Sequence, residues 1–121
     1  MLKVILDEKE AIAIIEPVDV LRKEDFDFAN EIINPFIKEN GRLNGIIIYT
    51  KSFPGWDSFG ALIRHMKFID NHEKKVSHVA FVTDSIIAEF AEHVASHFVS
   101  AKVKTFKFNE LEDAKKWIKN S

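Results

Sequence analysis

The stretch "LNGIIIYT", Leu43 to Thr50, decides the fold, because it is apolar almost without interruption. A strand with one solvated face alternates apolar and polar residues, whereas a strand covered on both faces is apolar throughout. The stretch therefore predicts a central strand of a sheet that is covered on both faces. A second apolar run, "VSHVAFVT" at residues 76–83, predicts another buried strand.

The residues before the central strand predict a hairpin and a helix. Leu2–Leu6 and Ala11–Glu16 are short apolar runs separated by a charged segment, which is typical of an antiparallel hairpin. The next segment has apolar residues at helical spacing, which predicts one buried face. That face comprises Phe26, Ala29, Ile33, Phe36 and Ile37. Asn40 and Gly41 are the expected end of the helix.

The residues after the central strand predict three helices and one more strand. The first two helices have apolar faces made of Phe59, Leu62, Ile63, Met66 and Ile69, and of Ile87, Phe90, Ala91, Val94 and Phe98. Lys102, Lys104 and Lys107 interrupt the last apolar run, as expected of an edge strand that must avoid stray pairing. In the last helix Leu111, Ala114, Trp117 and Ile118 should face the sheet. Asn109 and Glu112 are the expected capping box of this helix.

The element order is therefore β-β-α-β-α-β-α-β-α. It predicts an α/β fold with a five-stranded, mostly parallel mixed sheet, an N-terminal antiparallel hairpin and four helices. The 121 residues are enough for a single domain with a real core, over residues 1–121.

Composition narrows the function classes. The formal net charge of −2 lacks the excess of positive charge that binding to nucleic acid or to an anionic membrane requires. The absence of cysteine excludes structural disulfides and thiol catalysis. The first residues become charged too soon for a signal peptide and no apolar run is long enough to span a bilayer, so we expect a cytoplasmic protein. The eleven phenylalanines indicate either an aromatic core or a partly open apolar pocket.

The segment "SFPGWDSFGALIRH", Ser52 to His65, directly follows the central strand and is the candidate site. Ligands of open parallel sheets gather beyond the carboxyl ends of the strands, where the end of the second buried strand should also lie. The candidate ligand-binding residues are Phe53, Trp56, Asp57, Ser58, Thr83 and Asp84. Two alternatives stay open for Trp56, which either covers the core or lines a ligand or partner surface.

The element order, the strand "GIIIYT", the helix start "GWDSFGAL" and the strand end "VAFVTD" resemble the SpoIIAA-like proteins. That family is related to STAS domains and shares features with the CRAL-TRIO lipid-binding fold. The resemblance covers essentially the whole chain and implies a five-stranded mixed sheet without an established enzyme activity. Relatives include anti-sigma factor antagonists, which are switched by serine phosphorylation at a helix start, and ligand- or lipid-binding modules.

The phosphoserine switch of those antagonists is not matched here. Their Asp-Ser-Ser-Gly-Leu pattern corresponds to a segment in which Asp57, Ser58 and Gly60 match, but Phe59 occupies the phosphoacceptor position. Phe59 also follows the buried face of its helix. Ser58 is therefore interpreted first as a helix cap, with a ligand-facing role and phosphorylation as the alternatives.

The remaining chemistry-bearing residues predict neither a cofactor nor a metal. Glu89, His93 and His97 share one helical stripe, but Val94 occupies the position where a zincin motif needs glutamate. That stripe is interpreted as a solvated face, with metal or proton chemistry as the alternative. Ser58 and His65 lack the glycine-flanked turn of a hydrolase nucleophile.

The sequence predicts a non-enzymatic binding domain for a small, partly apolar, lipid-like or anionic ligand. The alternative is a regulatory protein-interaction module similar to anti-sigma factor antagonists, with the phosphoserine switch lost. No nucleic-acid partner and no transmembrane segment are expected. Phe28 and Phe68 lie off the buried faces of their helices, which predicts a homodimer unless the helix geometry returns both rings to the core.

Overall fold

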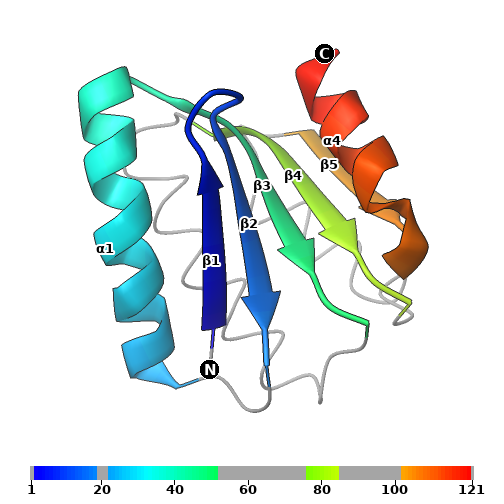
Figure 1. Ribbon diagram of the computed structural model, residues 1–121, viewed down its shortest axis with the longest axis horizontal. Coiled ribbons are helices and arrows are strands. Elements are labelled where there is room, and N and C mark those ends of the chain that lie inside the picture. The colour runs from blue at the N-terminus through cyan, green and yellow to red at the C-terminus, as the bar shows by residue number, and fades with distance from the viewer. Residues whose placement is uncertain (1, 19–21, 52–75, 85–101, 121) are drawn as a thin grey trace.

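The computed structural model describes residues 2–18, 22–51, 76–84 and 102–120. Its strands form one mixed sheet in the order β1-β2-β3-β4-β5, in which only β1 and β2 are antiparallel (Figure 1). The strands are β1 (Leu2–Asp7), β2 (Ile12–Pro17), β3 (Leu43–Tyr49), β4 (Val76–Val82) and β5 (Lys102–Phe106). The predicted hairpin, the mostly parallel sheet and the edge position of β5 are confirmed.

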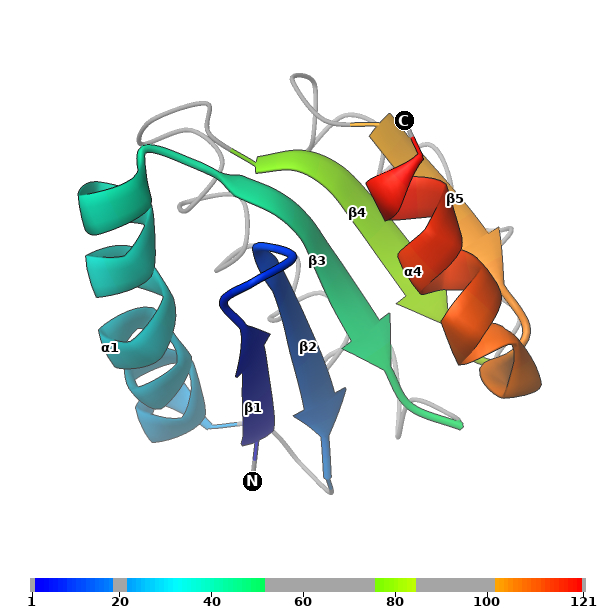
Figure 2. The ribbon, with the colours of Figure 1, turned by 45° about the horizontal axis from the view of Figure 1, so that its top comes forward.

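Two helices cover opposite faces of the sheet, because successive side chains of a strand point to opposite faces. Helix α1 (Lys23–Asn40) packs on the face that contains Ala13, Ile46 and Val79. Helix α4 (Leu111–Lys119) packs on the face that contains Ile14, Ile47 and Ala80. Figure 2 shows α1 beside β1, and α4 in front of the opposite end of the sheet.

The apolar faces of both helices are those that the sequence predicted. All five residues expected on the buried face of α1 are buried. In α4, Ala114 and Ile118 are buried, and Leu111 and Trp117 pack against the same cluster. The central strand β3 is buried on both faces from Gly45 to Ile48.

Two glycines explain where α1 ends and how α4 docks. Gly41 has a φ of 88°, a left-handed conformation that suits glycine, and its N–H donates to the carbonyl of Ile37 at 2.7 Å. At Gly45 an added Cβ would lie 2.6 Å from Cδ1 of Ile118, so α4 packs directly on the backbone of β3.

The predicted capping box of α4 is wrong, and two predicted helices cannot be compared with the structure. The capping interaction before α4 runs from the backbone N–H of Lys107 to Oε1 of Glu110 at 2.7 Å, and does not involve Asn109 and Glu112. The cause is a short 3₁₀ helix, η2 (Phe108–Glu110), which starts the helical segment earlier than the apolar spacing indicated. The two helices expected between β3 and β4 and between β4 and β5 lie outside the described residues.

Candidate functional site

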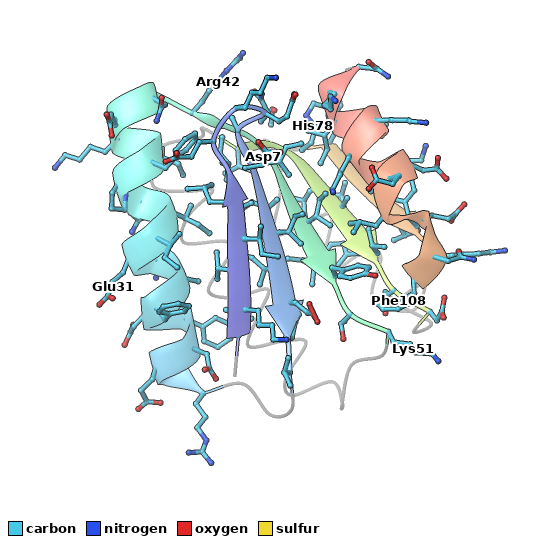
Figure 3. The ribbon with its side chains drawn as sticks, viewed as in Figure 1. Asp7, Glu31, Arg42, Lys51, His78 and Phe108 are labelled. Atoms are coloured by element: carbon cyan, nitrogen blue, oxygen red, sulfur yellow. The ribbon has the colours of Figure 1, made fainter. Side chains whose placement is uncertain are left out.

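The carboxyl ends of β3, β4 and β5, three of the parallel strands, are joined by backbone hydrogen bonds. The N–H of Thr50 donates to the carbonyl of Val82 at 3.2 Å, and the N–H of Thr83 donates to that of Phe106 at 3.0 Å. The N–H of Asp84 donates to the carbonyl of Lys51 at 3.0 Å. The strand ends therefore form a hydrogen-bonded edge, at which Figure 3 shows Lys51 and Phe108.

Thr83 and Asp84, two of the predicted ligand-binding residues, take part in this edge. The buried hydroxyl of Thr83 donates to the carbonyl of Lys51 at 3.2 Å. The carboxylate of Asp84 accepts from the N–H of Phe108 at 3.1 Å, and the Phe108 ring stacks on Tyr49 with centroids 4.6 Å apart. Both polar groups thus hold the strand ends together.

The other predicted ligand-binding residues are Phe53, Trp56, Asp57 and Ser58, and they lie outside the described residues. The structure therefore gives positions for Thr83 and Asp84, which are neighbours in the sequence, and none for the other four. The stripe of Glu89, His93 and His97 also lies outside them. Within the described ranges no group of three histidine, aspartate or glutamate residues could hold a metal ion.

A groove lies on the face of the sheet that α4 covers, between the β1–β2 hairpin and the side of α4. Its volume is about 140 Å³. The groove is lined by Asp7, Glu10, Ile12, Ile14, Glu112, Lys115, Lys116 and Lys119. The two isoleucines belong to the buried cluster beneath α4, so they form an apolar floor under a charged rim. We call this hollow the α4 groove.

Most charges at the rim already have partners. The ammonium of Lys119 lies 3.7 Å from the carboxylate of Glu10, and that of Lys115 lies 3.5 Å from the carboxylate of Glu112. A carboxylate oxygen of Asp7 accepts from the backbone N–H of Glu10 at 3.1 Å. The exposed ammonium of Lys116 has no partner among the described residues, so it is the rim cation available to a ligand.

His78 lies in β4 beneath α4 and is 93% buried, since its exposed fraction is 7%. Its ring meets the indole of Trp117 edge-on at 4.9 Å, and Nδ1 lies 3.0 Å from the hydroxyl of Ser77. Nε2 has no hydrogen-bond partner. Burial lowers the pKa of His78 below 6.5, and the nearby positive charge of Lys102 lowers this pKa further, against an opposing effect of the backbone at Asn44.

The sequence did not predict the α4 groove. Its floor residues, Ile12 and Ile14, were expected only as part of the strand Ala11–Glu16. A groove of this kind needs α4 to leave part of the β1–β2 face open, which depends on where the helix crosses the sheet. The signal in the sequence was the group of lysines around Trp117, at residues 115, 116 and 119, which does not by itself indicate a hollow.

The described structure defines a mixed-sheet α/β domain with helices on opposite faces and a small hollow beside one of them. The chain belongs to the SpoIIAA-like family, whose model matches residues 12–119. This membership places it among STAS-type regulatory and binding domains. Neither the curated proteins nor the solved structures gave a match to the chain. No helix in the described part of the chain is long and apolar enough to span a membrane.

Proposed function

We propose that the protein is a non-enzymatic binding domain for a small ligand that is apolar at one end and anionic at the other. The α4 groove carries this proposal, because it combines an apolar floor of Ile12 and Ile14 with the ammonium of Lys116, the rim lysine that is not paired with a carboxylate of the described residues. Its volume of about 140 Å³ is close to that of a cavity that accommodates benzene, so the apolar part of the ligand is short.

The affinity for such a ligand is modest. The floor isoleucines are already almost buried, so a ligand removes little additional apolar surface from water. An exposed ion pair with Lys116 adds no more than about 1 kcal/mol. We therefore expect weak binding of a short-chain probe such as hexanoate, with a dissociation constant of about 1 mM or higher.

A titration with hexanoate, followed by NMR chemical shifts, tests this proposal. Lys116→Glu should weaken hexanoate binding about fivefold, because it replaces an attraction of the carboxylate by a repulsion. Lys38→Glu is the matched control, since Lys38 is an exposed lysine of α1, which packs on the opposite face of the sheet, and it does not line the groove. Equal weakening by both variants would show a general effect of net charge and would contradict a site at the groove.

The carboxyl edge of the sheet is the second place that we propose for a ligand, with Phe53, Trp56, Asp57, Ser58, Thr83 and Asp84 as its residues. The hydrogen bonds of Thr83 and Asp84 to the neighbouring strand ends support it, because they hold these two residues in a defined position. In a Trp117→Phe variant Trp56 is the remaining tryptophan. A change in its fluorescence on addition of hexanoate would place the ligand at this edge.

Family membership favours one alternative, a regulatory protein-interaction module with the phosphoserine switch lost. Binding of a kinase-like or sigma-regulating partner would support it. Since Phe59 occupies the phosphoacceptor position, we expect such binding to be unchanged in Ser58→Ala. Phosphate on Ser58 in protein from its native cells, together with loss of partner binding in Ser58→Ala, would instead show a working switch.

A further inference from the structure

The charged side chains that line the α4 groove are balanced in number, but not all of them are paired. The lining contains three carboxylates and three ammonium groups, which belong to Asp7, Glu10, Glu112, Lys115, Lys116 and Lys119. The ion pairs of Glu10 with Lys119 and of Glu112 with Lys115 use four of these charges. One carboxylate, that of Asp7, and one ammonium, that of Lys116, are left over.

Asp7 and Lys116 lie on different sides of the groove. Asp7 is the last residue of β1 and lies opposite Ile12 of the groove floor (Figure 3), whereas Lys116 belongs to α4. Both side chains are exposed, and neither makes an ion pair with the other or with a further residue in the described ranges. One carboxylate oxygen of Asp7 accepts from the N–H of Glu10, which leaves the second oxygen for a ligand. The groove thus presents one anion and one cation above a single apolar floor.

These two charges favour a ligand that itself carries both signs of charge. A carboxylate alone is attracted by Lys116 but repelled by Asp7, and the reverse holds for an ammonium alone. The groove volume of about 140 Å³ leaves room for one head group and a short chain, so the two charges of the ligand must lie close together. An α-amino acid meets this requirement, because its ammonium and carboxylate share one carbon atom and its side chain is free to cover the isoleucines.

We propose that the ligand of the α4 groove is a free α-amino acid with an aliphatic side chain. Its carboxylate pairs with Lys116, its ammonium pairs with Asp7, and its side chain lies on Ile12 and Ile14. This inference rests on the proposed function, since it names the ligand class of the same groove. Asp7 is then the residue that distinguishes an amino acid from a simple fatty acid.

A comparison of norleucine with hexanoate tests this proposal, because norleucine is hexanoate with an ammonium on the carbon next to the carboxylate. In NMR titrations of the full chain, norleucine should have a dissociation constant about threefold lower than hexanoate, since an exposed ion pair is worth at most about a factor of five. Both probes should shift the methyl signals of Ile12 and Ile14. Norleucine amide, which keeps the ammonium but has no carboxylate, should bind more weakly than norleucine, which distinguishes a free amino acid from the amino terminus of a peptide.

Asp7→Asn separates the role of the charge from that of the fold. The amide oxygen of the new side chain still accepts from the N–H of Glu10, so the hairpin turn is kept. This variant should weaken norleucine binding about threefold but should not weaken hexanoate binding, so the preference for norleucine disappears. Glu8→Gln is the matched control, since it removes a carboxylate from the same hairpin that is exposed and does not line the groove. The preference should persist in Glu8→Gln.

Three results would overturn the proposal. If hexanoate shifts Ile12 and Ile14 but norleucine binds no more tightly, the amino-acid ligand is wrong while the proposed function stands. If neither probe binds at these methyl groups, both are wrong. A preference for norleucine that survives Asp7→Asn would also contradict the assigned pairing. Self-association through Phe28, which the sequence indicated and which is 48% exposed on α1, should not affect these ratios, because α1 packs on the opposite face of the sheet.

Discussion

His78 is a buried histidine with a ring nitrogen, Nε2, that has no partner, next to the edge of Trp117. Its neutral form is favoured in the folded protein, because burial and the charge of Lys102 both lower its pKa. The unfolded chain, by contrast, takes up a proton near pH 6.5, the ordinary value of a histidine. The folded state therefore loses stability as the pH falls below this value, until His78 is protonated in the folded state as well.

The pH dependence of unfolding checks this account of His78. We expect the free energy of urea unfolding to fall less between pH 7 and pH 5 in His78→Phe than in the wild type. The phenyl ring keeps the packing against Trp117 but does not titrate, and the comparison separates His78 from the other four histidines. The same decrease in both proteins would show that His78 has an ordinary pKa in the fold.

At the scale of elements, the contact between β3 and α4 fixes the position of the helix. A Cβ at Gly45 would lie 2.6 Å from Cδ1 and 2.8 Å from Cγ2 of Ile118, which is itself buried. Gly45→Ala should therefore destabilise the protein by about 1–3 kcal/mol in urea unfolding, as overpacking does. This substitution moves α4 away from β3, so it should also alter the chemical shifts of the groove residues.

A double-mutant cycle identifies the cause of that cost. In an Ile118→Ala background, which itself costs about 2–5 kcal/mol, the additional cost of Gly45→Ala should almost disappear. The methyl group then fits the space that the isoleucine has left. A cost of Gly45→Ala that is the same in both backgrounds would place the strain in the backbone of β3 and not in its packing against α4.

The strand β3 and the buried faces of α1 and α4 were predictable from the sequence. The unbroken apolar run of β3 identified a strand covered on both faces, and helical spacing identified the buried faces of α1 and α4. The start of α4 was not predictable in detail, because the carboxylate of Glu110 stabilises a 3₁₀ turn that apolar spacing does not encode. For the site, the sequence placed Thr83 and Asp84 at the carboxyl edge, but their side-chain hydrogen bonds to the backbone of Lys51 and Phe108 join residues far apart in the chain and follow no local pattern.

The scale of the whole molecule decides where a ligand can bind. The α4 groove exists because α4 contacts β3, β4 and β5 and leaves part of the β1–β2 face uncovered. This arrangement brings residues from the two ends of the chain together, as the ion pair of Lys119 with Glu10 shows. Such a juxtaposition depends on the crossing of the helix over the sheet, and no local sequence pattern contains it.

NMR of protein labelled at the isoleucine δ1 methyl groups, titrated with hexanoate, tests the binding site most directly. We expect shifts and intermolecular nuclear Overhauser effects at Ile12 and Ile14, which form the groove floor. The methyl signals of Ile33 and Ile37, which belong to α1 and to the buried cluster on the opposite face of the sheet, should remain unchanged. Binding of hexanoate with no effect at Ile12 and Ile14 would contradict a ligand site in the α4 groove.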